Sequence, residues 1–295
     1  MQTTDHKDAL STQSRSEVLI QALPYIQKYY SKIVVVKFGG SAMSGLNQKK
    51  QVMSDLVLLS LVGMKVVLVH GGGPEITQML TRLGRESKFV DGLRVTDRDS
   101  AEVATMVLAG KVNKELVGLI GNIGGKAVGL CGIDGGILAS QKLDDRLGFV
   151  GTVEKTDPQL ILDLLEHHYI PVVSSIGFDR EGNTYNVNAD TAASEIAASL
   201  KAESLILMTD TPGILRDRND PSSLIRTVAA PDAEALIACG TVDGGMIPKV
   251  RCCVLAAAKG VKRVFIIDGR VDHAVLIELL TDEGIGTMFV GSPPT

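Results

Sequence analysis

The chain has 295 residues, of which 45% are hydrophobic and 22% are charged, and its formal net charge is −4. This composition is typical of a globular protein with a large core, whereas a general nucleic-acid binder would need a basic surface. No apolar run approaches the ~20 residues of a membrane-spanning helix, and the N-terminal stretch lacks the apolar segment of a signal peptide. We therefore expect a cytoplasmic protein with no nucleic-acid or membrane partner.

The first expected element is a helix over residues 15–30 with an unusually wide apolar face. Two adjacent stripes make up this face, namely Leu19, Leu23, Ile26 and Tyr30, and beside them Val18, Ala22, Tyr25 and Tyr29. Pro24 removes one helical hydrogen bond and predicts a kink. Such a helix either folds back onto its own core or packs against another subunit, and the sequence favours the subunit contact.

Strand-like apolar runs then alternate with helical stretches. Strands are predicted at 32–38, 65–70, 127–132, 170–176, 204–210, 263–268 and 287–290. Helices are predicted at 47–62, 74–83, 99–120, 157–168, 190–200, 246–258 and 272–281. Continuous apolar strands that alternate with helices predict an α/β fold with a mostly parallel sheet covered on both faces. Ligands of such sheets bind beyond the carboxyl ends of the strands.

Two stretches interrupt this alternation. Residues 141–153 (QKLDDRLGFVGTV) look like a charged loop that leads into a short strand or hairpin. Residues 177–189 (GFDREGNTYNVNA) are polar and rich in Gly and Asn. The second stretch divides the chain into a longer N-terminal part and a shorter C-terminal part.

Glycine-rich turns follow the first two predicted strands of the sheet. Their sequences are KFGGS at 37–41 and HGGGPE at 70–75. Glycine lets bare backbone N–H groups approach an anion, and a helix that starts after such a turn adds its positive end. Two such turns, one of them with a lysine, favour a shared site for phosphoryl oxygens over simple tight turns. For Ser41 we expect no role beyond capping the next segment.

Three further stretches carry polar side chains that a binding site would use. Arg94 in DGLRVTD is either a surface arginine or a fork that binds a carboxylate. Asn186, Asn188 and Asp190 alternate in YNVNADTAA and so point the same way, although Asp190 would also serve as a helix N-cap. Lys249 in GGMIPKV lies in the first turns of a helix, where the dipole disfavours a cation unless an anion binds nearby.

The familiar nucleotide and metal signatures are missing from the sequence. No G-x-x-x-x-G-K-[ST] occurs, no G-x-G-x-x-G follows a strand, and the protein-kinase signatures are absent. The five histidines show no H-E-x-x-H arrangement. The four cysteines form no C-x-x-C pair, so we expect buried free thiols at Cys131, Cys239, Cys252 and Cys253.

Seven stretches occur in one order along the chain: VVVKFGGSAM, VHGGGPEI, DGLRVTD, LAGKVNKELV, YNVNADTAASEIA, LMTDTPGIL and GGMIPKV. Together they resemble the amino acid kinase family from about residue 18 to 291. GLRVTD, KVNK and NVNAD are particular to the branch of that family that acts on N-acetyl-L-glutamate. The resemblance implies a three-layer αβα sandwich around a central, mostly parallel sheet.

The reaction implied by the resemblance is transfer of the γ-phosphoryl group of MgATP to the γ-carboxylate of N-acetyl-L-glutamate. The product would be an acyl phosphate, formed in the second step of arginine biosynthesis. Residues 1–30 would form a kinked helix for oligomerisation. Residues 31–185 would bind N-acetyl-L-glutamate and form a dimer, and residues 186–295 would bind ATP and arginine.

The resemblance also implies a role for each motif residue. Lys37 and Lys249 would stabilise the moving phosphoryl group, and Asp190 would hold both lysines. Gly40 and Gly72 would donate backbone N–H groups to the phosphoryl oxygens. The substrate would be bound by Gly72, Gly73, Arg94 and Asn186. The nucleotide would be bound by Thr209, Asp210, Gly213, Ile214, Leu215, Met246 and Lys249. Mg²⁺ would be held mainly by ATP phosphates and water, with no side-chain ligand assigned.

Both ends of the chain resemble arginine-sensitive members of the family. In those members the N-terminal helix interlaces dimers into a hexamer, and L-arginine inhibits the enzyme. The corresponding site here would include Tyr30, Glu278 and Gly284. Phe265 stands where many sensitive members have His, which leaves retention of the inhibition open. A PII signalling protein controls some relatives, and the sequence leaves that partner open too.

Two alternatives stay open at the level of sequence. One is another kinase of the family, which would act on aspartate, glutamate, carbamate or a nucleoside monophosphate. GLRVTD and NVNAD argue against it. The other is a non-catalytic amino-acid sensor that kept the fold. The presence of Lys37, Lys249 and Asp190 together argues against that alternative.

Overall fold

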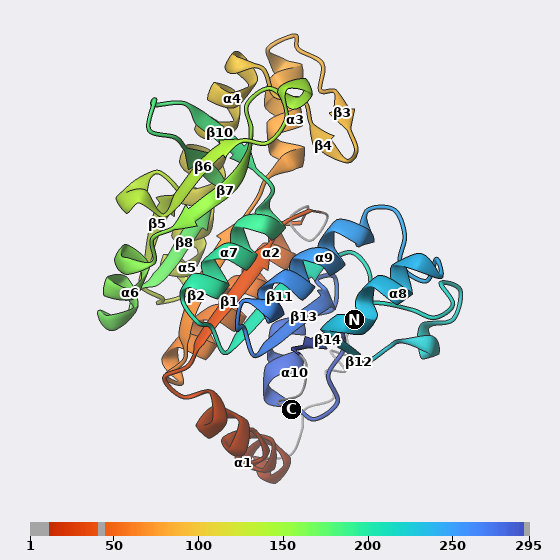
Figure 1. Cartoon of the computed structure of the whole chain (residues 1–295). Helices are drawn as coiled ribbons and strands as arrows, with labels where there is room; N and C mark the ends of the chain where they lie inside the picture. The colour runs from red at the N-terminus through yellow and green to blue at the C-terminus, as the bar shows by residue number, and fades with distance from the viewer. Residues whose placement is uncertain (1–11, 41–44, 292–295) are drawn as a thin grey trace, which may run out of the picture.

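An eight-stranded sheet forms the centre of the computed structural model, which describes residues 12–40 and 45–291 (Figure 1). Across the sheet the strands are β12 (Thr227–Ala229), β14 (Thr287–Val290), β13 (Arg263–Asp268), β11 (Ser204–Thr209), β1 (Ile33–Phe38), β2 (Lys65–His70), β8 (Ile170–Ser174) and β5 (Ala127–Cys131). Neighbouring strands are parallel except for β13 and β14, which are antiparallel. The predicted mostly parallel sheet is therefore confirmed. Ser41 and the first eleven residues lie outside the described part of the chain.

Helices cover both faces of this sheet, as predicted. One face packs against α2 (Leu46–Leu61), α5 (Asn113–Asn122) and α10 (Ala274–Leu280), and the other against α6 (Gln159–Glu166), α7 (Ala189–Ser199) and α9 (Met246–Ala258). The burial of strand β1 on both faces explains why its sequence is mostly apolar. Val34 and Val36 are buried in the first core, whereas Val35 is buried in the second. A strand covered on both faces has no polar side.

A closed barrel of four short strands lies at one end of the main sheet (Figure 1). It consists of β6 (Leu138–Lys142), β7 (Val150–Thr156), β9 (Ile176–Phe178) and β10 (Thr184–Val187). The hairpin expected around residues 141–153 is the antiparallel pair β6 and β7, although both strands extend beyond the predicted limits. The strand predicted at 170–176 ends at Ser174, because the chain leaves the main sheet there and enters the barrel.

The helix predicted at 99–120 is not one regular helix. It consists of α4 (Arg98–Thr105), a π-helical segment η2 (Met106–Val112) and α5. The glycine turn after β2 leads into α3 (Gly73–Arg82). Short elements that the sequence did not predict include β3 (Phe89–Val90), β4 (Leu93–Arg94), β9, β10, β12 and α8 (Ala233–Ala238), together with 3₁₀ turns at Asp134–Gly136, Asp145–Leu147, Pro221–Ser223 and Ala230–Asp232.

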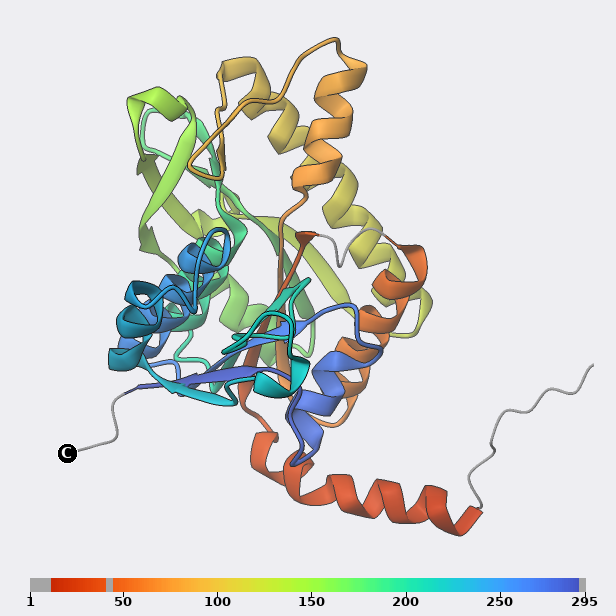
Figure 2. The same ribbon diagram turned by 90° about the vertical axis from the view of Figure 1, so that its right-hand side faces the viewer.

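Helix α1 (Thr12–Tyr29) extends away from the body of the molecule, with Pro24 inside it (Figure 2). Its last turn is anchored, because Tyr29 is buried and the guanidinium of Arg263 lies 5.0 Å from the centre of its ring. Further toward the N-terminus, Leu19 is 73% exposed and Leu23 is 45% exposed. Half of the predicted apolar face is therefore exposed in the single chain.

All four cysteines are free thiols. Cys131 and Cys253 are buried and Cys252 is half-buried, but Cys239 is exposed, so the expectation of a buried thiol is wrong there. Cys239 follows the short helix α8, which the sequence did not predict and which leaves its end in solvent. Among the helices of the described residues, none has the length and apolar character needed to cross a membrane.

Candidate active site

The two glycine turns lie next to each other at the carboxyl end of the sheet. Strands β1 and β2 pair in parallel, with Lys37 opposite Val69 and Phe38 opposite His70. The N–H of Gly71 donates a hydrogen bond of 3.3 Å to the carbonyl of Phe38, which ties the second turn to the end of β1. Gly40 has a φ of +70°, a left-handed conformation that favours glycine. The backbone N–H groups of both glycine turns therefore lie close together at the carboxyl end of the sheet.

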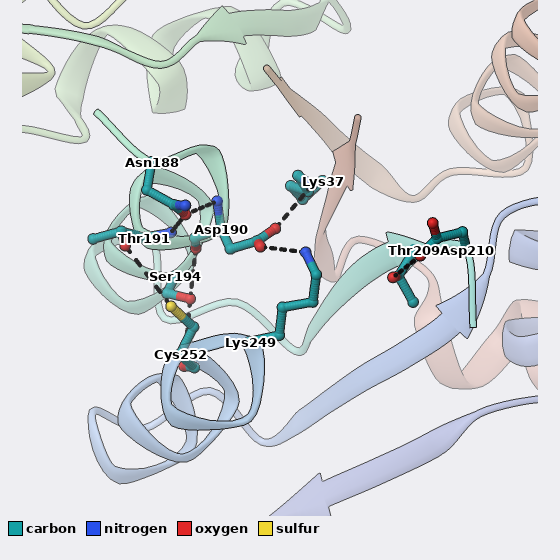
Figure 3. Close-up of polar contacts among 9 residues, drawn as sticks. All are labelled: Lys37, Asn188, Asp190, Thr191, Ser194, Thr209, Asp210, Lys249 and Cys252. Atoms are coloured by element: carbon teal, nitrogen blue, oxygen red, sulfur yellow. Dashed lines mark hydrogen bonds and ion pairs between the residues drawn. The ribbon is translucent and has the colours of Figure 1, made fainter. Parts of the chain in front are cut away.

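Two lysines contact one buried aspartate beside these turns (Figure 3). Lys37 Nζ lies 2.9 Å from Asp190 Oδ1, and Lys249 Nζ lies 2.6 Å from Asp190 Oδ2. Lys37 and Asp190 are each 6% exposed, whereas Lys249 is half-buried. The three side chains come from β1, the first turn of α7 and the first turns of α9. Three segments far apart in sequence therefore meet at this cluster.

Asn188, rather than Asp190, caps the N-terminus of α7. Its Oδ1 accepts hydrogen bonds from the N–H groups of Asp190 at 2.9 Å and Thr191 at 3.2 Å. The alternative that Asp190 serves as the N-cap is therefore wrong. Because Asn188 satisfies the open end of the helix, the carboxylate of Asp190 stays available for the two lysines.

The pKa of Asp190 reflects these opposing surroundings. Burial by itself would raise the pKa of this carboxyl, but the charges of Lys37 and Lys249 and their hydrogen bonds outweigh burial and lower the pKa to about 2. Asp190 is therefore ionised at neutral pH. With both lysines protonated, the cluster carries one net positive charge at the end of the sheet.

A cavity of ≈ 240 Å³ opens on one side of this cluster. The residues predicted for catalysis and substrate binding all line it: Lys37, Gly40, Gly72, Gly73, Arg94, Asn186, Asp190 and Lys249. Ser175 and Phe89 also line this cavity, and no sequence motif pointed to them. A cavity with backbone N–H groups, cations and an amide suits a small anionic molecule.

Arg94 is buried, so the alternative of a surface arginine is wrong. Its Nη2 donates to the carbonyl of Gly73 at 2.9 Å and to Thr77 Oγ1 at 2.8 Å, and its Nη1 donates to Ser87 Oγ. Phe89 lies against it, with the guanidinium carbon 4.8 Å from the ring centre. Burial lowers the pKa of Arg94 from its usual value. These contacts fix the guanidinium at the wall of the cavity.

A larger cavity of ≈ 480 Å³ lies on the other side of Lys249. The residues predicted for nucleotide binding all line it: Thr209, Asp210, Gly213, Ile214, Leu215, Met246 and Lys249. Lys249 lines both cavities and therefore stands between them. This volume falls within the range of cavities that hold cofactor-sized ligands.

An ion pair that the sequence did not indicate also borders the larger cavity. Arg218 and Asp243 come from two different loops, and their side chains contact each other. Nothing in the local sequence around either residue predicts this contact, because each lies in a loop whose path depends on the rest of the fold.

The residues predicted for regulation lie away from both cavities. Glu278 is at the end of α10, and its Oε2 accepts hydrogen bonds from the N–H groups of Ile285 at 2.8 Å and Gly286 at 3.1 Å. Gly284 is in the same loop and has a φ of +51°. Tyr30 follows α1, which contacts α10, and its side chain is exposed. The structure thus groups Glu278 with Gly284.

Comparison with known sequences gives two results. The profile described as "Amino acid kinase family" matches residues 32–268. A protein named "Acetylglutamate kinase" from Brachyspira hyodysenteriae is 57% identical over 282 residues, which cover 95% of this chain and 98% of that protein.

Two solved structures have the same fold over most of the chain. Both are N-acetylglutamate synthase from Neisseria gonorrhoeae, one complexed with coenzyme A and N-acetyl-glutamate and the other with coenzyme A and L-arginine. The first has a TM-score of 0.84 and 27% identity, and the match covers 95% of this chain and 64% of that one. The second has a TM-score of 0.77 and 26% identity, covering 93% of this chain and 65% of that one.

We predict that Asp190→Asn destabilises the protein at neutral pH by about 3–5 kcal/mol, because the buried Lys37 and the half-buried Lys249 lose their shared carboxylate. A carboxyl with a lowered folded-state pKa contributes stability above its unfolded pKa, and this contribution is lost as the pH falls toward the folded value of about 2. The difference between wild type and Asp190→Asn should therefore shrink between about pH 5 and pH 2. Urea unfolding at several pH values measures it.

Glu166→Gln is the matched control for this measurement. Glu166 also forms an ion pair with a lysine, Lys65, but on the surface, where such a pair contributes at most about 1 kcal/mol. Equal effects of the two substitutions at neutral pH, or a difference that grows on acidification, would contradict the coupling of Asp190 to the lysines.

Proposed function

The chain belongs to the amino acid kinase family and is a phosphotransferase that acts on a carboxyl group, and we propose that its acceptor is N-acetyl-L-glutamate. The reaction transfers the γ-phosphoryl group of ATP to the γ-carboxylate and gives N-acetyl-L-glutamyl 5-phosphate, in the second step of arginine biosynthesis. One observation carries the proposal: Lys249 lines two cavities at once and shares Asp190 with Lys37.

We place the acceptor in the smaller cavity. Its α-carboxylate would accept hydrogen bonds from Arg94, whose guanidinium the surrounding residues hold in place. Asn186 would donate its amide to a second polar group of the substrate. These two side chains set the distance from the α-carboxylate to the glycine turns, and so they direct the γ-carboxylate toward Lys37. The 57% identity to a protein named for acetylglutamate supports this acceptor.

We place ATP in the larger cavity, with its phosphates directed toward Lys249. Ile214, Leu215 and Met246 offer apolar surface for the adenine, and Thr209 and Asp210 offer polar groups. Within the described residues no group of three His, Cys, Asp or Glu side chains is arranged to bind a metal. Two aspartates, Asp210 and Asp243, line the larger cavity, and Asp243 is paired with Arg218. Carboxylate oxygens of this kind suit Mg²⁺, which would be held mainly by ATP phosphates and water.

The chemistry requires little from the protein beyond position and charge. A γ-carboxylate oxygen attacks the γ-phosphorus of ATP, the bond to the β,γ-bridging oxygen breaks, and ADP leaves. A carboxylate is already ionised at neutral pH, so the reaction needs no general base. The obstacle is repulsion between two anions, which the positive cluster and preorganised N–H groups reduce. Bound Mg²⁺ would neutralise charge on the β- and γ-phosphates.

Each residue of the cluster has a distinct task in this proposal. Lys37 stabilises charge on the phosphoryl group from the acceptor side, and Lys249 does so from the ATP side. Asp190 keeps the two ammonium groups close to each other in spite of their repulsion. Gly40 and Gly72 offer backbone N–H groups to the equatorial oxygens, and Gly73 lies beside the substrate.

The two lobes follow from the same arrangement. The strands of the sheet fall into two groups, with β12, β14, β13 and β11 on one side and β1, β2, β8 and β5 on the other. We propose residues 31–185 as the acceptor lobe and residues 186–295 as the ATP lobe, which meet where β1 pairs with β11.

The acceptor is tested by incubating the protein with MgATP and each candidate acid, and trapping the acyl phosphate with hydroxylamine. We expect hydroxamate with N-acetyl-L-glutamate and at least a hundredfold lower kcat/KM with L-glutamate, because a site built for the acetyl group is left with unpaired polar groups by the free amine. Aspartate and carbamate serve as further controls.

The same assay separates the alternatives. Faster turnover with glutamate, aspartate or carbamate would assign the chain to another kinase of the family. An absence of turnover with every acceptor, together with binding of an amino acid, would support a non-catalytic sensor.

We also propose inhibition by L-arginine at a site that includes Glu278, Gly284 and Tyr30. Two observations support it. One Glu278 oxygen bonds the backbone of the following loop, which fixes the carboxylate beside Gly284, and a structurally similar synthase is described in complex with L-arginine. Phe265 is buried in the core beneath α10, so it supplies no polar contact. Cytoplasmic location and a PII partner stay predictions from the sequence.

The exposed apolar face of α1 supports a hexamer in which this helix joins dimers. We propose that arginine acts beside the same helix. Deletion of residues 1–28 should then reduce the mass measured by light scattering from a hexamer to a dimer.

The regulatory prediction concerns Glu278→Gln. We expect L-arginine to inhibit the wild type below about 10 mM, and Glu278→Gln to raise the half-inhibitory concentration at least tenfold, because the guanidinium loses its charge partner. Glu283→Gln, in the same loop but outside the proposed site, should leave inhibition unchanged. Wild-type activity that is insensitive to arginine would remove the regulatory proposal and leave the proposed reaction standing.

A further inference from the structure

One motif has no role in the proposed mechanism. Residues Lys111–Lys114 (KVNK) span the end of the π-helical segment η2 and the start of α5, and Asn113, the first residue of α5, is completely buried. A π-helical segment carries an extra residue per turn, which shifts the side chains after it, and such segments frequently occur at functional sites. Here Asn113 contacts His70 at the end of β2, Leu130 of β5 and Val172 of β8.

The contacts of Asn113 determine how its amide is oriented. Its Nδ2 lies 2.8 Å from the carbonyl of Val172 and 3.1 Å from the carbonyl of Leu130, and both of these can only accept. Its Oδ1 accepts from Lys114 Nζ at 3.0 Å, and an ammonium can only donate. The NH₂ group of Asn113 must therefore face His70 Nε2, which lies 3.1 Å away.

This orientation fixes the protonation state of His70. Its Nε2 faces this NH₂ group, whose two hydrogens are shared among three acceptors, and a proton on Nε2 would meet only donor hydrogens, so Nε2 carries no proton. Its Nδ1 lies 2.9 Å from the carbonyl of Gly71 and must donate, so it carries the proton. Burial, which is the main cause, lowers the pKa of His70 to about 4 and keeps the ring neutral. Both nitrogens of this buried side chain are thereby used.

The hydrogen bond to Gly71 has a consequence for Gly72. The carbonyl of Gly71 and the N–H of Gly72 belong to one peptide unit, which is planar and trans, so they point in opposite directions. When His70 holds the carbonyl on its own side, the N–H of Gly72 is directed to the other side. Gly71 and Gly72 both line the smaller cavity.

The π-helical segment also contacts this turn directly. A Cβ atom placed on Gly72 would lie 2.6 Å from Leu108 Cδ2 and 3.4 Å from Val112 Cγ2, so the turn packs closely against η2. The other carbonyls of the turn are engaged as well, since Gly72 accepts from the N–H of Ile76 at 2.9 Å and Gly73 accepts from Arg94. The turn therefore has little freedom to rotate a peptide.

We propose that His70 and Asn113 are positioning residues that aim the N–H of Gly72 at the transferring phosphoryl group. Asn113 fixes the tautomer and the plane of the imidazole, and His70 Nδ1–H fixes the peptide between Gly71 and Gly72. This inference rests on the proposed function, because the N–H of Gly72 has a role only if a phosphoryl group is transferred at this site.

The test compares His70→Leu with His70→Asn. Both lose Nε2, but the Asn amide can place an N–H donor where Nδ1–H was, whereas Leu has no donor. The remaining acceptors of Asn113, the carbonyls of Leu130 and Val172, still match its two amide hydrogens in both variants. The pair therefore isolates the bond to Gly71.

We expect His70→Leu to lower kcat about 10- to 100-fold, which is less than the effect of removing an oxyanion donor completely. The KM values for ATP and for N-acetyl-L-glutamate should stay within about threefold of wild type. His70→Asn should restore most of the lost turnover. If kcat falls equally in His70→Leu and His70→Asn, and thermal stability falls with it, the role of His70 is purely structural and the proposal is overturned. So would a His70→Leu enzyme with wild-type kcat.

A second measurement keeps the proposal testable if His70→Leu fails to fold. Long-range ¹H–¹⁵N spectra of the histidine-labelled wild type should show one neutral, Nδ1-protonated ring that does not titrate between pH 5 and pH 9, and this signal should vanish in His70→Asn. An Nε2-protonated ring, or titration near the ordinary pKa, would refute the inference. Wild-type turnover is measured in parallel, so that its absence would refute the proposed function instead.

Discussion

The structure depends on one arrangement of charges, in which two lysines share a single buried carboxylate. An unpaired cation is costly to bury, and two neighbouring cations repel each other. Asp190 offsets both effects for Lys37 and Lys249, and its own pKa falls to about 2 as a result. The cluster keeps one net positive charge between two cavities. That charge is what two anionic substrates need in order to approach each other.

The fold brings the three residues of this cluster together from distant parts of the sequence. Lys37 is the last residue but one of a central strand, Asp190 lies in the first turn of α7, and Lys249 lies in the first turns of α9. The two helices lie on the same face of the sheet and contact each other. Parallel strands bring their carboxyl ends to one edge, so the glycine turns after β1 and β2 must meet there. The cluster and the backbone N–H groups thus arise from one topology.

Much of the fold was predictable from the sequence, because the apolar strands and the amphipathic helices are long and regular. The cation of Lys249 at a helix start was also informative, since it conflicts with the helix dipole unless charge is nearby. The π-helical shift at η2 was not predictable, because it depends on packing against the turn at Gly72. The sequence offered Asp190 as the N-cap of α7, whereas Asn188 caps it, since both residue types are good caps. Contacts between loops, such as Arg218 with Asp243, depend on the complete fold.

The central claim is that Lys37 and Lys249 act together on one phosphoryl group. The most direct measurement is a double-mutant cycle of single-turnover rates with saturating MgATP and acceptor, using Lys37→Met, Lys249→Met and the double variant. We expect each single variant to lose about 10²–10³-fold, and the double variant to lose less than the product, with a coupling of at least about 1 kcal/mol. The account would be contradicted if the rate loss of the double variant equals the product of the two single losses. Single variants with wild-type rates would contradict it as well.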